Sequence, residues 1–257
     1  LKFQLNSFWI VKYGIKKIQI NIPYFLVIVL FILLIYAHLE ALIVLKIRRY
    51  TIPVNRLSNN SYIRIAHISD THVHYPYPQI TPKKLQKIVQ MINKERVDCV
   101  LFTGDLISDH SPYVLSKDIP SIVSALKELE APVFICFGNH DVDCQQSLIQ
   151  ALSEIKTVPV KVLDQQTVDF MVDHSRSQSS STPFKIYISG IKPSLNLDET
   201  AGFINEIRAN FRGDPNDCHI LMAHMPDAAD AASSSGIFDI QFSGHSHGGQ
   251  CVLPLNS

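Results

Sequence analysis

The segment VDCVLFTGDLISD at residues 97–109 joins an apolar run of strand length to a Gly-Asp pair. The same pattern, an apolar run followed at once by polar residues, occurs at residues 63–72 and again at 132–141. Residues 82–94 and 119–129 lie between these runs and have the apolar spacing of helices. Alternating strands and helices predict parallel strands with helical crossovers, an α/β fold. Ligand sites in such sheets gather beyond the carboxyl ends of the strands, where these polar residues fall.

The second half of the chain is richer in expected strands. Apolar runs of strand length occur at residues 158–163, 167–172, 184–191, 218–223 and 237–243. One helix is expected between them, at residues 198–211. The Ser-rich stretch at 174–183 is typical of an exposed hairpin loop and not of a domain linker.

Five short patches carry the residues with metal-binding chemistry: SDTH at 69–72, GDLISD at 104–109, GNHD at 138–141, AHMP at 223–226 and GHSHGGQ at 244–250. Their candidate metal ligands are Asp70, His72, Asp105, Asn139, His224, His245 and His247. Carboxylate, amide and imidazole ligands without a thiolate suit Mn, Fe or Zn better than Ca or Cu(I). Two such divalent cations, about 3.5–4 Å apart, clamp the attacking and leaving oxygens of an in-line phosphoryl displacement.

Within this set, Asp105 is the expected bridge, because one carboxylate can bind a metal ion with each of its two oxygens. His140 is next to a ligand but is not needed as one. We therefore expect it to be catalytic, either stabilising charge on the transferring phosphoryl group or protonating the leaving oxygen. His74 continues the period-two series of Asp70 and His72, so an extended backbone would aim it toward the same place, as a candidate substrate-binding residue.

Taken singly, each patch has a simpler interpretation. His224 lies beside Met222 and Met225 and could be a hydrogen-bonded core histidine. Gly104 and Gly138 could be ordinary turn residues that need a positive φ. Asp109 and Asp141 are expected to support the ligands or cap helices and not to bind metal. The five patches in this order favour the metal interpretation over these alternatives.

The five patches resemble the signature of the calcineurin-like metallophosphoesterases, over about residues 63–254. GHSHGGQ followed by Leu253 and Pro254 is similar to a membrane-associated bacterial branch of that family. The resemblance implies two mixed sheets flanked by helices and a catalytic role for His140. It also implies one metal ion on Asp70, His72, Asp105 and His247, and a second ion on Asp105, Asn139, His224 and His245.

The formal charge of zero hides an asymmetry. Residues 1–57 contain eight Lys or Arg and one Glu, a formal charge of +7, and residues 58–257 therefore carry −7. A nucleic-acid surface needs a basic stripe that neutralises phosphates, so an acidic domain argues against a nucleic-acid partner. We expect residues 58–257 to form the catalytic domain. Family members usually continue beyond the position of Ser257, so the C-terminal end of this domain is expected to be incomplete.

Residues 1–57 have the features of a membrane anchor. Residues 24–37 form an unbroken apolar run, which extends to residue 45 if His38 and Glu40 are tolerated. A spanning helix needs about 20 apolar residues, so the longer run is adequate. Residues 8–22 have an apolar helical face flanked by lysines, as in helices that lie on anionic bilayers.

The expected location is the bacterial inner membrane. Lysines and arginines follow the apolar run closely, which favours a cytoplasmic catalytic domain. The five cysteines have no CxxC spacing and suit a reducing compartment.

A phosphoesterase on a membrane is expected to act on a lipid or a nucleotide-linked lipid. The branch that the chain resembles includes UDP-2,3-diacylglucosamine diphosphatases of lipid A synthesis, which cut a pyrophosphate and release UMP. The alternative within the class is a different lipid or cell-wall phosphoester. A non-catalytic scaffold of the same fold is disfavoured, because such scaffolds lose ligands or the catalytic histidine. Nothing in the sequence specifies an oligomeric state.

Overall fold

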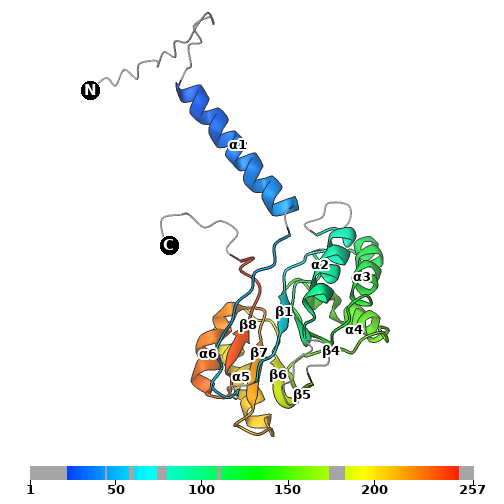
Figure 1. Cartoon of the computed structure of the whole chain (residues 1–257), viewed down its shortest axis with the longest axis vertical. Coiled ribbons are helices and arrows are strands. Elements are labelled where there is room, and N and C mark those ends of the chain that lie inside the picture. Colours follow the sequence, from blue (N-terminus) through cyan, green and yellow to red (C-terminus); the bar gives the residue numbers. More distant parts are fainter. Residues whose placement is uncertain are drawn as a thin grey trace, which may run out of the picture. The chain divides into compact units, whose positions relative to one another are not determined.

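The computed structural model describes residues 22–43, 45–57, 61–73, 80–108, 111–173 and 183–248. The chain divides at Arg49–Tyr50 into two units. The first holds helix α1 (Ile22–Ile43), and the second holds the other described helices and strands (Figure 1). This division precedes the boundary expected at residues 57–58, because Val54 and Leu57 pack against the core of the second unit.

The first sheet has the strand order β1-β2-β3-β4 and is parallel throughout. Its strands are β1 (Ile65–Ile68), β2 (Cys99–Thr103), β3 (Val133–Cys136) and β4 (Val160–Val162). The register places Ala66 opposite Val100, and Val100 opposite Val133. All residues of β2 are buried, as expected for a central parallel strand that is covered on both faces.

Three helices accompany this sheet: α2 (Pro82–Glu95), α3 (Pro112–Leu126) and α4 (Gln145–Ser153). At the start of α2, the Thr81 hydroxyl accepts the Lys84 N–H at 3.0 Å and Pro82 occupies the first turn. Both features favour a helix start, because the first amides of a helix lack partners within it. Arg96, in the left-handed conformation, ends the helix. The buried face of α2 is formed by Leu85, Val89 and Ile92, as the apolar spacing predicted.

The second sheet has the order β5-β6-β7-β8 and is mixed. Its strands are β5 (Gln166–Val172), β6 (Phe184–Gly190), β7 (Cys218–Met222) and β8 (Ile240–Phe242). β5 runs antiparallel to β6, whereas β6, β7 and β8 are mutually parallel. Helices α5 (Leu197–Asn210) and α6 (Ala229–Ser235) belong to this half, as does the short 3₁₀ turn η2 (Pro226–Ala228). A second such turn, η1 (Val142–Cys144), precedes α4.

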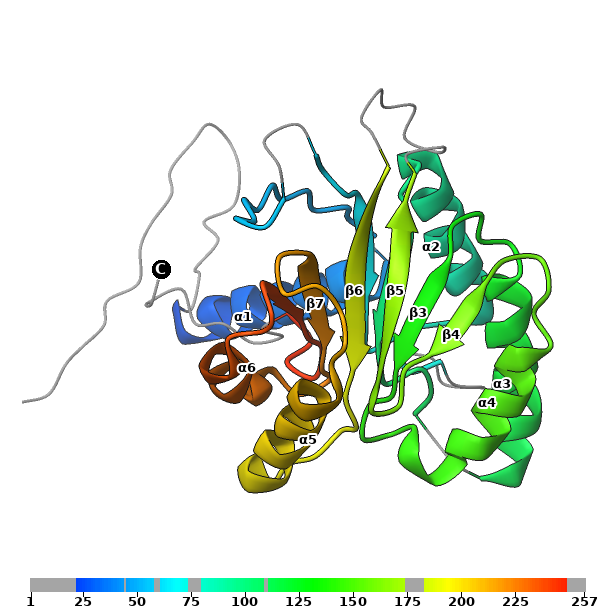
Figure 2. The same cartoon turned by 90° about the horizontal axis from the view of Figure 1, so that it is seen from below.

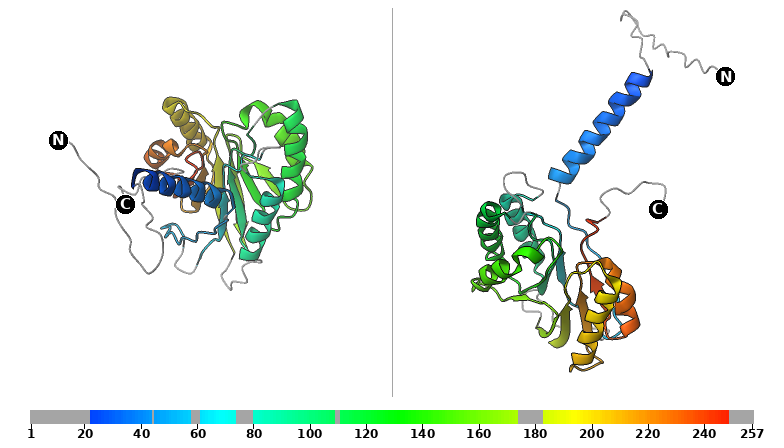
Figure 3. Two further views of the ribbon diagram at one scale, coloured as in Figure 1. Left: turned by 90° about the horizontal axis from the view of Figure 1, so that it is seen from above. Right: turned by 180° about the vertical axis from the view of Figure 1, so that it is seen from behind.

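The second unit is a sandwich of two sheets between two layers of helices. Helices α2, α3 and α4 cover the outer face of the first sheet, and α5 and α6 cover that of the second (Figures 2 and 3). The two inner faces form one apolar cluster, in which Leu101 and Phe134 of the first sheet lie with Ile188 and Met222 of the second. This packing sets the carboxyl ends of β1, β2 and β3 against those of β7 and β8.

The expectation that both sheets would be mixed is wrong for the first, whose described strands are all parallel. Helical crossovers connect β1 to β2, β2 to β3 and β3 to β4, and such crossovers return the chain in the same direction. Helices α4 and α6 were not expected. The first is nine residues long and the second, ADAASSS, has no large apolar residues to show a helical period.

Helix α1 exposes most of its apolar side chains from Tyr24 to Tyr36, with exposed fractions from 43% at Ile35 to 70% at Tyr24, and only Val29 is partly buried. Among the described residues, no helix combines the length and the apolarity that a bilayer crossing requires, so the expected spanning helix is not supported. The amphipathic segment expected before α1 lies outside the described residues.

Candidate metal centre

The candidate ligands lie where strands of the two sheets end. In the first sheet, Asp70 follows β1, Asp105 follows β2 and Asn139 follows β3. In the second sheet, His224 follows β7, and the GHSH residues follow β8. The side chains come together because both sheets point their parallel strands toward the same edge of the sandwich (Figure 2).

An unusual backbone conformation marks these loops. Positive φ occurs at seven described non-glycine residues, five of which are candidate ligands: Asp70 (52°), His72 (42°), Asp105 (52°), His245 (64°) and His247 (50°). Each such residue costs about 1 kcal/mol or more, and the strain persists only where surrounding bonds enforce it. Here the Asp70 N–H donates to the Gly104 carbonyl and the His72 N–H donates to the Asp105 carbonyl, both at 3.0 Å.

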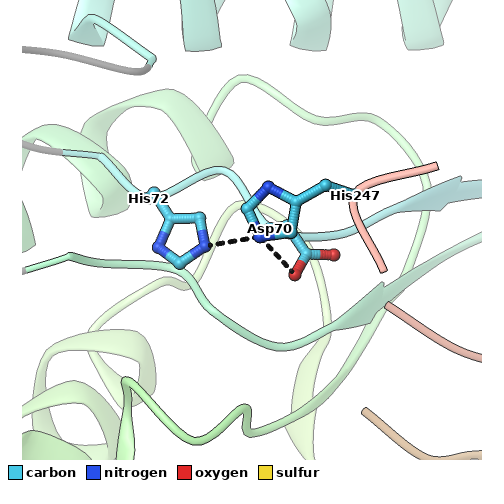
Figure 4. A group of neighbouring side chains, drawn as sticks. All are labelled: Asp70, His72 and His247. Atoms are coloured by element: carbon cyan, nitrogen blue, oxygen red, sulfur yellow. Dashed lines mark hydrogen bonds and ion pairs between the residues drawn. The ribbon is translucent and has the colours of Figure 1, made fainter. Parts of the chain in front are cut away.

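One group of side chains joins the first patch to the last. Asp70 Oδ1 lies 3.6 Å from His247 Nε2, which lies 3.3 Å from His72 Nε2 (Figure 4). The two imidazole rings stack, with centroids 5.0 Å apart. The three donor atoms lie within 4.8 Å of one another, close enough to bind one metal ion. Residues 175 positions apart in sequence thus form one candidate site.

A second group forms around Asp105, whose side chain is almost fully buried. Asp105 Oδ2 lies 3.5 Å from His72 Nε2 and 3.2 Å from His224 Nε2. Asn139 Oδ1 lies 3.2 Å from the same His224 nitrogen. Asp105 therefore contacts ligands of both proposed ions, as the bridging role predicts. Its other oxygen, Oδ1, accepts the backbone N–H of His140 at 2.9 Å.

These contacts shift the pKa values in opposite directions. Burial alone would raise the pKa of Asp105, but the hydrogen bond and positive charge of His224 outweigh it and lower that pKa. For His224, burial would lower the pKa, and the bond to Asp105 raises it instead. Burial lowers the pKa of His72, against the attraction of Asp105. Metal binding requires ionised carboxylates and neutral imidazoles. The shifts of Asp105 and His72 favour these states, whereas the raised pKa of His224 means that an ion binding there would displace a proton.

The orientation of His224 is set by a backbone carbonyl. His224 Nδ1 lies 2.7 Å from the Thr103 carbonyl oxygen, which leaves Nε2 to face Asp105 and Asn139. Metal-binding histidines are commonly held this way, through the ring nitrogen that does not bind the metal. Sequence reasoning did not identify Thr103, because a carbonyl group is common to every residue and leaves no signal in the sequence.

His140 and His245 occupy less central positions. The His140 ring packs edge-on against His72, with centroids 4.9 Å apart, and one of its nitrogens lies within 4.8 Å of donor atoms of His72 and Asp105. The His245 N–H donates to both oxygens of Asp70, at 2.9 and 3.1 Å. Its ring lies 5.3 Å from that of His224. His74 lies outside the described residues, and so does Asp109.

Gly138 allows the loop after β3 to lie close against the loop after β2. A Cβ atom on Gly138 would overlap Asp105 Oδ1 and would lie 2.5 Å from the Asp105 nitrogen. A side chain at this position would therefore displace the carboxylate that bridges the two groups. Gly138 is therefore more than an ordinary turn residue, because its lack of a side chain leaves room for Asp105.

The donor chemistry of these residues fits divalent metal ions. Three overlapping groups of three donors are present among the described residues: Asp70, His72 and His247; His72, Asp105 and His140; and Asp70, Asp105 and His224. Each of Asp70, His72 and Asp105 belongs to two of these groups, so the groups adjoin one another.

The family model for calcineurin-like phosphoesterases matches residues 63–249. The chain belongs to the calcineurin-like phosphoesterase family. This phosphoesterase is therefore a hydrolase of a family that uses divalent metal ions, and it holds an Asp/His cluster able to bind them.

The phosphoesterase is similar to proteins from several sources. An uncharacterized metallophosphoesterase of Aquifex aeolicus is 24% identical over 83% of this chain and 74% of that protein. The UDP-2,3-diacylglucosamine pyrophosphatase LpxG of Chlamydia trachomatis is 24% identical over 75% of this chain and 65% of that protein, just under two thirds of its length. A solved structure of a novel archaeal phosphodiesterase has a TM-score of 0.35 and 19% identity, over 62% of this chain and 72% of that one.

Proposed function

We propose that this protein holds two divalent metal ions and hydrolyses a lipid-linked phosphoester or pyrophosphate at a membrane surface. Our preferred ion is Mn²⁺, with Fe and Zn as alternatives, because the ligands are oxygens and imidazole nitrogens. Asp70, His72, Asp105 and His247 would hold one ion. Asp105, Asn139, His224 and His245 would hold the other. The observation that supports this most directly is that Asp105 Oδ2 contacts both His72 and His224.

The side chains divide the work of such a reaction. When bound, two divalent ions stabilise the negative charge that develops on a transferring phosphoryl group. His140 is half-buried and lies beside the ligand groups, so its imidazole can hold the proton that the leaving oxygen needs. Its backbone N–H fixes Asp105, which keeps the histidine and the bridging carboxylate in one arrangement. The His247 side chain is 29% exposed and marks the side from which a substrate can approach.

The proposed substrate is UDP-2,3-diacylglucosamine, cleaved to 2,3-diacylglucosamine 1-phosphate and UMP. Two observations support a lipid substrate. Helix α1 exposes a continuous series of apolar side chains, which is typical of a segment that contacts lipid. A relative that is 24% identical over 75% of this chain is named as a pyrophosphatase of this compound. The alternative is another lipid or cell-wall phosphoester, for which the same apolar helix would serve.

The same proposal assigns the protein to the cytoplasmic face of the bacterial inner membrane. Lys46, Arg48, Arg49 and Arg56 follow the apolar run, and basic residues are enriched on the cytoplasmic side. Apolar side chains of α1 would enter the lipid layer peripherally, while the catalytic domain remains in water. The interaction needs no spanning helix.

The test compares UDP-2,3-diacylglucosamine with UDP-glucosamine and follows UMP release by the full chain in the presence of Mn²⁺ and phospholipid vesicles. Preference for the acylated compound is expected. Equal rates on both compounds, or no UMP from either, would refute the lipid A assignment and leave the phosphoesterase class intact.

A pair of helix variants tests the membrane contact. Leu30→Glu with Leu33→Glu should reduce vesicle binding and the rate on the lipid substrate, while a small chromogenic phosphodiester is cleaved as before. Leu30→Ala with Leu33→Ala is the matched control, because it shortens the same side chains without adding charge. Equal vesicle binding by both pairs would contradict the proposed contact.

A further inference from the structure

The last residue of the GNHD patch, Asp141, is a fully buried carboxylic acid, with 0% of its surface exposed. Its oxygens are occupied by backbone amides. Oδ1 accepts the N–H of Leu106 at 2.9 Å and that of Ile107 at 3.4 Å, and Oδ2 accepts the N–H of Gly138 at 2.9 Å. Asp141 belongs to none of the donor groups that could hold a metal ion. Its carboxylate is therefore placed to bind backbone.

The amides that Asp141 binds belong to two different ligand loops. Leu106 and Ile107 follow Asp105 directly, on the loop after β2. Gly138 precedes Asn139, on the loop after β3. One side chain thus spans the two loops that carry the bridging carboxylate, the amide ligand and His140. The backbone of Asp141 is fixed as well, because its N–H donates to the Gly138 carbonyl at 3.1 Å.

The connection continues to the loop after β1 through the peptide of Leu106. While the Leu106 N–H donates to Asp141, the Leu106 carbonyl accepts the Val73 N–H at 2.9 Å and the Thr71 hydroxyl at 3.1 Å. Thr71 and Val73 flank His72 on either side. A displacement of Leu106 would therefore move the backbone on both sides of a candidate ligand.

Only a carboxylate satisfies all three amides. It presents acceptor oxygens on both sides, whereas an asparagine of the same shape has one oxygen and one NH₂ group. If the asparagine oxygen pointed toward Leu106 and Ile107, its NH₂ group would face the Gly138 N–H, and two hydrogen-bond donors would oppose each other. The reverse orientation would leave the two amides after Asp105 without an acceptor. A buried N–H without an acceptor is unfavourable, so either orientation would push the loops apart.

We propose that Asp141 is a positioning residue that assembles the metal centre, by holding the loops of Asp105 and Asn139 at the spacing that two ions require. The inference rests on the metal ligands proposed above. Outer partners of metal ligands typically contribute about 10- to 100-fold to metal affinity. Replacing Asp141 with asparagine should weaken Mn²⁺ binding by about this factor.

Asp98→Asn is the matched control. Asp98 is also a buried aspartate, 6% exposed, whose carboxylate accepts a backbone N–H, that of Arg64 at 2.7 Å. It immediately precedes β2, at the opposite end of the strand from the Asp105 loop. The control therefore makes the same chemical change at a buried site away from the candidate ligands.

The experiment titrates the metal-free full chain with Mn²⁺ by calorimetry, without substrate. Asp141→Asn should weaken binding about 10- to 100-fold, and Asp98→Asn should leave it within about twofold of the original protein. Hydrogen exchange of the metal-free proteins should show faster exchange of the Leu106 and Gly138 amides in Asp141→Asn only. Excess Mn²⁺ should restore part of the turnover, because the metal can reassemble the loops.

Unchanged Mn²⁺ affinity in Asp141→Asn, or an equal loss in Asp98→Asn, would overturn the inference. If the original protein binds no Mn²⁺, the proposed metal centre fails first and the inference falls with it. Thr71→Val is the second variant, should Asp141→Asn not fold. It removes the hydroxyl bonded to the Leu106 carbonyl and should weaken Mn²⁺ binding by up to roughly 10-fold, whereas unchanged affinity would again count against the role of Leu106.

Discussion

The two sheets contribute different chemistry to the same centre. The first sheet supplies the candidate oxygen ligands, namely the carboxylates of Asp70 and Asp105 and the amide of Asn139, together with His72. The second sheet supplies histidines only: His224, His245 and His247. Negative charge that attracts cations is therefore built into one half of the sandwich, and neutral ligands from the other half complete the site.

The candidate ligands within each half also lie at different depths. Asp105 and His72 of the first sheet are 1% and 4% exposed, whereas the His247 side chain of the second is 29% exposed. His224 is the exception, at 1%, because it follows the central strand β7 and is held by the Thr103 carbonyl of the first sheet. Asn139 of the first sheet is exposed as well, so the centre of the site is formed by Asp105, His72 and His224, and its rim by residues of both sheets.

The largest effect on turnover and metal content is expected from removing the carboxylate of Asp105. Asp105→Ala should lower turnover by a factor on the order of 10⁴ and remove both metal ions, because this carboxylate contacts ligands of both groups. His247→Ala should instead remove about one ion of two. Elemental analysis of the purified proteins measures the difference, and equal metal content in the two variants would argue against a bridging Asp105.

Substitution of His140 is expected to change the metal content less than substitution of the candidate ligands around it. His140→Ala should lower turnover roughly 10²- to 10⁴-fold while metal content stays nearly intact, since general acid catalysis is lost and the ligands remain. The measurement is kcat beside the Mn²⁺ content of the same sample. Parallel loss of metal and activity would make His140 a ligand, which its nitrogen within 4.8 Å of donor atoms of His72 and Asp105 would allow.

The smallest effect concerns the contribution of His219 to stability. His219 lies near the start of β7, away from the candidate ligands that follow β7 and β8. Burial, with a further contribution from Arg56, lowers the pKa of His219 from the ordinary 6.5 to about 4. Between pH 6.5 and pH 4 the unfolded chain takes up a proton at this histidine that the folded protein does not. The contribution of neutral His219 to the free energy of unfolding is therefore fully present above pH 6.5 and is lost as the pH falls below it. The loss between pH 7 and pH 5 should be about 2 kcal/mol in the free energy of unfolding.

His219→Phe isolates this contribution, because it keeps an aromatic ring among Phe211 and Phe238 but cannot take up a proton. Urea unfolding at pH 7 and pH 5 should show a smaller acid loss in the variant than in the original protein. The same loss in both would assign the acid sensitivity to other groups, such as those of the first sheet.

The sequence predicted the strands of both halves of the fold and missed one helix in each half. Buried parallel strands are continuous apolar runs, so β1, β2 and β3 were placed to within a few residues. Helices α4 and α6 were missed, because a short helix with few large apolar residues shows no period. The parallel pairing of the first sheet follows the prediction made from alternating strands and helices, whereas the mixed first sheet implied by the family resemblance is wrong.

For the site, the sequence by itself determined which residue types were available and that each follows a strand, because ligand chemistry is local to a side chain. The tertiary structure alone decided which of them meet. It brings Asp70 to His245 across 175 positions, and it orients the His224 ring through a backbone carbonyl of the other sheet. It also places the two oxygens of Asp141 against the backbone of two different loops. Such contacts depend on how two sheets pack and on backbone groups common to all residues, and neither property can be read from the order of side chains.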